Sequence, residues 1–270
     1  MTYKDILVIA DDAKTAPTRF DAVAALSDMD AHLVALHVME PPYTPASLMH
    51  GAPSVLLEWQ ESVIRERLEK TKKVVEEAER RTGMKYEWRQ VKGQTVDVAL
   101  QHAQYADLVV VSQATTDEDT SLDLMPEELI MASGRPVMLV PRYGKFPVIG
   151  ERILVAWNRT RESTRAVHDA LPLLQRAKSV RIMEVNPAGK HIAGADIATH
   201  LARHGVRAEV GSVSAEDMKA GDIILSRAAD LGADLLVMGA YGHSRLREYT
   251  FGGVTLHILR HMTIPVLMSH

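Results

Sequence analysis

The chain has 270 residues, a formal net charge of −4 and no cysteine, and 46% of its residues are hydrophobic. That length suits one large or two ordinary domains, and the composition is typical of a globular core. The small charge gives no general attraction to nucleic acid or anionic membrane, and the absence of cysteine excludes disulfides and thiolate metal ligands. No apolar run approaches the ~20 residues that span a bilayer. We therefore expect a cytoplasmic protein that binds neither nucleic acid nor membrane.

In the first part of the chain, apolar runs alternate with helical patterns. Strands are expected at 6–10, 32–38, 86–91, 108–112 and 137–140. Helices are expected at 18–26, 54–81, 96–105 and 127–132. Strands that alternate with helices predict a mainly parallel sheet with helices on both faces and right-handed crossovers.

The same pattern repeats after a linker at 142–150 that carries glycine and proline, and the second half includes an expected helix at 163–177. The sequence ERILVA at 151–156 corresponds to KDILVI at 4–9, and GADLLVM at 232–238 corresponds to YADLVVV at 105–111. Repetition at this length indicates two copies of one supersecondary unit. The sequence therefore predicts two tandem α/β domains, 1–142 and 151–270, each with five strands.

A glycine-bearing loop lies between the apolar strand at 235–238 and a helix that begins at Val254. Its glycines are Gly239, Gly242, Gly252 and Gly253, and its polar donors are His243, Ser244, Arg245 and Arg247. Glycines let the backbone approach a phosphate, and a helix N-terminus offers free N–H groups and a positive dipole end. This segment predicts an anion site, and the alternative is an ordinary strand-to-helix connection.

Other polar pairs carry weaker signals. His243 and Ser244 are adjacent, so they seldom orient onto each other as base and nucleophile. The histidine pairs have ligand-capable i, i+4 spacing, but a solvated helix face is the favoured interpretation, and Asp11-Asp12 is interpreted as an acidic turn. These pairs are His200 with His204 and His257 with His261. We predict no catalytic residue and no metal site.

Three features together resemble the universal stress protein signature. They are the spacing Gly239-x-x-Gly242, nine residues and Gly252, the strand sequence ILVAWN at 153–158 and the final sequence IPVLM at 264–268. The resemblance covers both halves and indicates a tandem universal stress protein that takes part in a stress response. It implies Rossmann-like domains related to the adenine nucleotide alpha hydrolases. Many members bind ATP or AMP where the first and fourth strands separate, and Mg²⁺ would accompany ATP.

Carried over residue by residue, the resemblance implies one nucleotide site in the second half. Val185 would contact adenine and the glycines the phosphates, while Asn158 replaces the family's aspartate. Gly253 stands where Ser or Thr is usual, and Arg245 or Thr255 could replace that donor. The candidate nucleotide-binding residues are Asn158, Val185, Gly239, Gly242, His243, Ser244, Arg245, Gly252, Gly253, Val254 and Thr255.

The first half lacks the glycines after its fourth strand. Its loop carries Asp117, Glu118, Asp119 and Asp123 instead. A carboxylate ~4 Å from a phosphate at an effective dielectric of ~20 costs ~4 kcal/mol, so this half is expected to be a degenerate structural partner. The alternative function is a nucleotide-free scaffold of the same fold, and an enzyme would show at most weak ATP hydrolysis.

The resemblance also implies how the two halves associate. Single-domain members dimerise through their last strands, so 137–140 and 266–268 would pair within one molecule. An apolar cluster near the start of the helix at 54–81 could pack on the other half or on a second subunit; its members are Met49, Val55, Leu56, Leu57 and Trp59. The sequence leaves open whether the chain is a monomer or a homodimer.

Overall fold

The computed structural model describes residues 2–26, 30–42, 53–114, 125–186, 194–214, 218–242 and 253–270. The strands of the first half are β1 (Asp5–Ile9), β2 (His32–Met39), β3 (Tyr86–Lys92), β4 (Leu108–Ser112) and β5 (Val137–Val140). Its helices are α1 (Ala16–Leu26), α2 (Pro53–Thr82), α3 (Thr95–Ala103) and α4 (Met125–Ala132).

The second half follows the same order. Its strands are β6 (Arg152–Ala156), β7 (Ser179–Val185), β8 (Ala208–Val213), β9 (Leu235–Gly239) and β10 (Val266–Ser269). Its helices are α5 (Arg161–Asp169), α6 (Leu171–Arg176), α7 (Ala195–Arg203), α8 (Ala220–Asp230) and α10 (Val254–His261).

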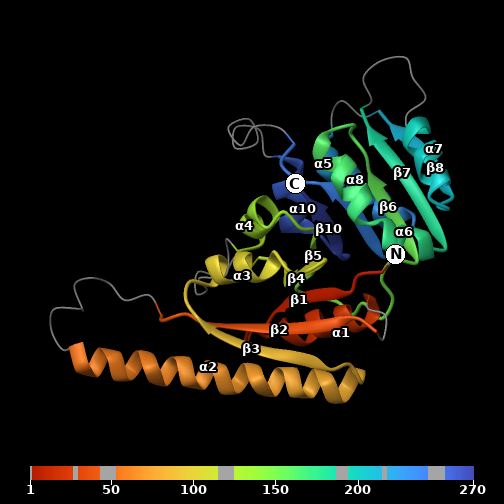
Figure 1. Ribbon diagram of the computed structural model, residues 1–270. Helices are drawn as coiled ribbons and strands as arrows, with labels where there is room; N and C mark the ends of the chain where they lie inside the picture. The colour runs from red at the N-terminus through yellow and green to blue at the C-terminus, as the bar shows by residue number, and fades with distance from the viewer. Residues whose placement is uncertain are drawn as a thin grey trace.

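All these strands form one ten-stranded sheet in the order β3-β2-β1-β4-β5-β10-β9-β6-β7-β8. The two halves lie side by side along it (Figure 1). Pairs within each half are parallel, whereas β5 and β10 are antiparallel, with Leu139 opposite Val266 and Met138 opposite Leu267. The expected fold class, tandem units with a parallel five-stranded sheet and helices on both faces, is confirmed.

Each face of the sheet has its own apolar core because successive strand residues point to opposite faces. Ile6 and Val8 of β1 pack into the core that includes Phe20 of α1. Leu7 and Ile9 pack into the opposite core with helices that include α3. Burial on both faces explains why the central strands are continuous apolar runs rather than alternating ones.

One expected helix, 163–177, is two helices in the structure. α5 ends at Asp169, and α6 starts at Leu171 with Pro172 in its first turn. Proline has no amide hydrogen to continue the bonding pattern of the preceding helix, so the break falls where Pro172 stands. The sequence expectation of one continuous helix was wrong at this point.

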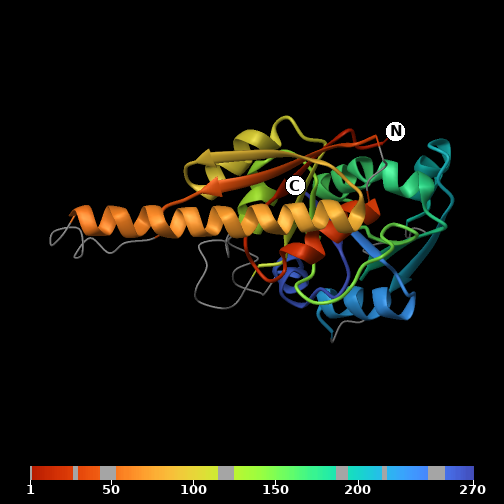
Figure 2. The same cartoon turned by 90° about the horizontal axis from the view of Figure 1, so that it is seen from below.

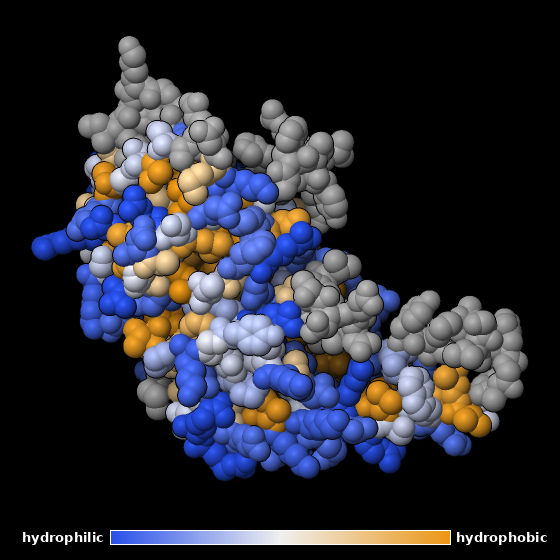
Figure 3. All heavy atoms as spheres, turned by 180° about the vertical axis from the view of Figure 1, so that it is seen from behind, coloured by the Kyte–Doolittle hydropathy of each residue, from blue (hydrophilic) through white to orange (hydrophobic). Residues whose placement is uncertain are grey.

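Helix α2 has 30 residues, and its amino-terminal part projects beyond the sheet (Figure 2). Towards its other end Thr71, Val75 and Ala78 are buried. At the projecting end Leu57 is 58% exposed and Trp59 48% exposed, and apolar atoms are visible there (Figure 3). None of the helices in the described ranges is long and apolar enough to cross a membrane.

Candidate functional site

A cavity of about 190 Å³ opens in the second half, where β6, β7 and β9 end. It is lined by Ala156, Trp157, Asn158, Met183, Val185, Ala220, Ile224, Met238, Gly239, Tyr241, Gly242, Val254 and Thr255. The chain leaves β6 towards β7 on one side and returns to β9 on the other. The carboxyl ends of strands at such a switch point are where open α/β sheets bind ligands.

Gly239 and Gly242 allow close contact between the end of β9 and the start of α5. A Cβ on Gly239 would lie 2.4 Å from the backbone nitrogen of Ser163 and 2.5 Å from the carbonyl carbon of Glu162. A Cβ on Gly242 would lie 2.9 Å from Oε2 of Glu162. Any side chain at 239 would therefore push the end of β9 away from α5.

The start of α5 is held by a capping box. The Ser163 amide donates to Oγ1 of Thr160 over 3.3 Å, and Oγ of Ser163 accepts from the Thr160 amide over 3.1 Å. Asn158 Oδ1 accepts the Thr160 hydroxyl at 2.9 Å. Asn158 therefore shapes the turn before α5 and also lines the cavity.

Three non-glycine residues in the described ranges have a positive φ, and all follow strands of this site. They are Arg159 (φ 61°) after β6, Asn186 (φ 49°) after β7 and Tyr241 (φ 56°) after β9. This backbone region is sparsely populated, and such residues gather at ligand sites. Arg159 also pairs with the buried Glu184, with Nε and Oε1 3.3 Å apart.

Two helices begin at the cavity. Ala220 of α8 and Val254 of α10 are lining residues, and neither N-cap, Lys219 or Gly253, makes a side-chain capping bond. Thr255 is 2% exposed, and its Oγ1 accepts the Tyr241 amide at 3.2 Å. The positive ends of two helix dipoles thus point to one cavity without a capping carboxylate from their N-cap residues.

The equivalent positions of the first half are occupied by its own side chains. Oε2 of Glu40 accepts the Thr95 amide at 2.9 Å and the Thr95 hydroxyl at 2.5 Å, which caps α3. Asp11 pairs with Arg19, which is 1% exposed, at 2.8 Å. Sequence reasoning missed the cap because Glu40 and Thr95 lie 55 residues apart and no local motif links them.

The histidine pairs have different surroundings. The expectation of a solvated face for His257 was wrong, because its Nε2 lies 2.8 Å from Oδ1 of Asp222 and its ring packs where Gly221 has no side chain. The His200 and His204 rings lie 4.7 Å apart and both neighbour His168 of α5. In the part of the chain that the structure describes, no three His, Asp or Glu side chains are arranged to hold a metal ion.

The structure therefore brings most of the described candidates together. Asn158, Val185, Gly239 and Gly242 line one cavity with Val254 and Thr255, and Gly253 directly precedes Val254. The remaining candidates His243, Ser244, Arg245 and Gly252 lie outside the described residues. So does the acidic loop that carries Asp117, Glu118, Asp119 and Asp123.

Fold and cavity define the class: a tandem α/β protein with a ligand-sized cavity at the switch point of its second half. A family model described as the universal stress protein family matches residues 2–116 and again 150–270. The chain belongs to the universal stress protein family. The family and tandem type expected from the sequence are thus confirmed.

Individual relatives agree with this assignment. The universal stress protein Slr1230 of Synechocystis sp. is 46% identical over 48 residues, which span 18% of this chain and 17% of that protein. A universal stress protein from Archaeoglobus fulgidus superposes with a TM-score of 0.72 at 15% identity, covering 98% of this chain and 95% of that one. One from Pseudomonas aeruginosa gives 0.57 at 17% identity, covering 99% and 93%. These structures share the fold.

Proposed function

We propose that the chain binds one adenine nucleotide, ATP or AMP, in its second half and that this binding serves a stress response. The observation that carries the proposal is the cavity itself. It gathers Asn158, Val185, Gly242 and Val254 from segments far apart in the sequence. A nucleotide has an apolar ring, a polar sugar and an anionic tail, and the cavity offers a counterpart for each.

The apolar part of the cavity, with Met183, Val185 and Ile224, suits the adenine ring. Asn158 lies at the end of β6, where an amide can bond a ribose hydroxyl without adding charge. The phosphates would lie at Gly242 and the start of α10, where the N-cap residue Gly253 supplies no side-chain cap and the helix N-terminus favours an anion. Mg²⁺ would accompany ATP.

The first half would carry no nucleotide. Glu40 already caps the helix start that corresponds to α8, one of the two helix N-termini that face the cavity in the second half. Asp11, which corresponds to Asn158 in the repeat, is held by Arg19 at 2.8 Å. The N-terminus of α3 and the Asp11 carboxylate, which would have to contact a nucleotide in the first half, are therefore both engaged within the protein.

The residues that line the cavity favour nucleotide binding over rapid ATP hydrolysis. The described lining residues include no histidine and no carboxylate that could activate a water molecule. Glu162 lies beside Gly242, but its carboxylate is buried and pairs with Nε of Arg161 at 3.5 Å. We therefore propose at most slow ATP hydrolysis.

Titration calorimetry with ATP and AMP tests this proposal. Wild-type protein should bind one nucleotide per chain. Gly242→Asp should abolish binding, because it adds a carboxylate where the phosphates lie, whereas the matched Gly242→Ala adds a Cβ without charge and should retain binding. Unchanged affinity in Gly242→Asp would contradict the site.

A scaffold function is the second candidate, and the projecting end of α2 favours it. Val55 is 65% exposed and Leu57 58% exposed, which leaves apolar area free for a protein partner. Absence of binding heat with wild-type protein at high micromolar ATP would favour this alternative. Mass measurement of the purified protein for co-purified nucleotide gives an independent answer.

A further inference from the structure

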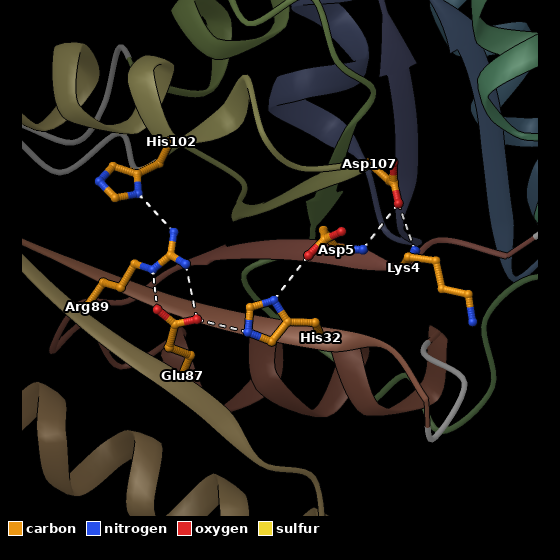
Figure 4. A network of polar contacts seen from close by, with 7 residues as sticks. All are labelled: Lys4, Asp5, His32, Glu87, Arg89, His102 and Asp107. Atoms are coloured by element: carbon orange, nitrogen blue, oxygen red, sulfur yellow. Dashed lines mark hydrogen bonds and ion pairs between the residues drawn. The ribbon is translucent and has the colours of Figure 1, made fainter.

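The two halves differ at a second place, between the third strand and the helix that follows it. In the first half Arg89 of β3 fills this place (Figure 4). Its guanidinium donates to both carboxylate oxygens of Glu87, over 2.6 and 3.0 Å, and lies 3.5 Å from Nδ1 of His102 on α3. Glu87 also meets His32 at 2.9 Å. This polar network occupies the face of the sheet beside α3.

The strand registers identify the corresponding residue of the second half. Arg89 lies opposite Leu36 of β2, and Gly211 lies opposite Met183 of β7. Glu209 of β8 likewise corresponds to Glu87. A Cβ added to Gly211 would meet no atom within 4 Å. The place that an arginine fills in one half is therefore open in the other.

A groove of about 160 Å³ results, and we call it the β7–β8 groove. It is lined by Leu154, Arg181, Ile182, Met183, Gly211, Ser212, Val213, Arg227 and Leu231. Leu154 and Met183 are buried to 1% and 4% exposure, so the floor is apolar. The groove is separate from the cavity described above, although Met183 contributes to both.

The rim of the β7–β8 groove is cationic. Arg181 and Arg227 belong to its wall, whereas their ion-pair partners Glu209 and Asp230 do not. The Arg181–Glu209 contact is 2.5 Å, but the side chains are 49% and 69% exposed, and exposed pairs contribute little. Guanidinium groups bind carboxylates in a planar, bidentate manner.

We propose that the β7–β8 groove binds a small amphipathic carboxylate. Its apolar body lies on Leu154 and Met183, and its carboxylate meets the guanidinium groups of Arg181 and Arg227. The first half cannot take such a ligand because the Arg89 side chain occupies the corresponding space. The proposal does not depend on nucleotide binding.

Octanoate is the probe, with 1-octanol as its uncharged counterpart, and binding is measured by calorimetry in the presence of saturating AMP. Octanoate should bind with a Kd on the order of 1 mM, as expected for a ligand of this size. 1-Octanol should bind at least about tenfold more weakly, because it makes no charged hydrogen bond.

The variants exploit the repeat. Gly211→Arg introduces the side chain that Arg89 provides in the first half, with Glu209 placed to pair with it. This variant should abolish octanoate binding because the arginine fills the groove. Gly211→Ala is the matched control and should retain it, since its Cβ meets open space. Arg181→Gln should weaken octanoate about tenfold while leaving 1-octanol unchanged. Thermal unfolding and far-UV circular dichroism confirm that each variant is folded, and neither measurement requires nucleotide binding.

Three results would overturn the proposal. Octanoate could fail to bind the wild-type protein, Gly211→Arg could bind it with unchanged affinity, or octanoate and 1-octanol could bind equally well. The last result would mean non-specific apolar association. Shifts of the Met183 methyl signal on octanoate addition, present in wild type and absent in Gly211→Arg, would place the ligand in the groove.

Discussion

Gly239, which lines the cavity of the second half, lies against Ser163 of α5: a Cβ on Gly239 would lie 2.4 Å from the Ser163 amide nitrogen. Ser163 belongs to the first turn of α5 and is itself held by the Thr160 cap. The end of β9 and the start of α5 can therefore touch only because residue 239 has no side chain. This contact fixes one wall of the site.

Gly239→Ala should lower the free energy of unfolding by about 1–3 kcal/mol, because the methyl group must displace backbone rather than a flexible side chain. Urea denaturation measures the loss. The control is Gly211→Ala, whose Cβ meets nothing within 4 Å, and it should change stability by less than about 0.5 kcal/mol. Equal effects of the two substitutions would show that the contact at α5 is looser than the structure indicates.

Glu162→Gln should tighten ATP binding at least about threefold, because it removes a negative charge beside Gly242 where the phosphates would lie. The gain should be smaller for AMP, which carries fewer phosphates. Calorimetry with both nucleotides checks the difference. The exposed Glu66→Gln on α2, remote from the cavity, is the control and should leave both affinities unchanged. A weakened ATP affinity in Glu162→Gln would argue that the phosphates lie elsewhere.

The sequence predicted the architecture well because its signals are local. The apolar runs at 108–112 and 137–140 coincide with β4 and β5, and the helix start at Val254 is correct. The family resemblance and the glycine spacing indicated Asn158, Val185 and Gly242, and these residues line one cavity.

What the sequence did not predict depends on contacts between distant residues. The Glu40 cap on Thr95, the Asp222 partner of His257 and the groove at Gly211 each need the strand register or a helix pair to be known. Pro172 is the exception, since a proline inside the expected helix 163–177 was a local signal.

His37 should make stability fall at acidic pH. It is 6% exposed, and burial lowers its pKa, while Asp12 and Asp11 oppose that shift in part. Because the folded pKa lies below the unfolded value of about 6.5, the stabilisation is complete above that pH and is lost as pH falls below it.

Urea denaturation of wild type and His37→Gln, compared at neutral and mildly acidic pH, tests this point. The wild-type free energy of unfolding should drop more between the two conditions than that of the variant. Gln101→Ala, an exposed position without a titratable group, should keep the wild-type pH response. An identical response in His37→Gln would assign the acid sensitivity to other groups.

Gln113 joins the two halves beside the β5–β10 pair. Its Nε2 donates to the Leu259 carbonyl of α10 over 2.8 Å, and its Oε1 accepts the Arg142 amide at 3.2 Å. Gln113→Ala leaves the buried carbonyl unsatisfied and should lower the free energy of unfolding by about 1–3 kcal/mol. The exposed Gln101→Ala on α3 should be nearly neutral. Equal stability of the two variants in urea would mean that the halves do not rely on this contact.

Photolabelling with 8-azido-ATP followed by peptide mapping tests the central claim most directly. One nucleotide in the second half predicts saturable labelling, competed by unlabelled ATP, in peptides that contain Trp157 or Val185, and loss of that labelling in Gly242→Asp. Labelling within residues 10–40 or 115–124, or no saturable labelling anywhere in the chain, would contradict the account.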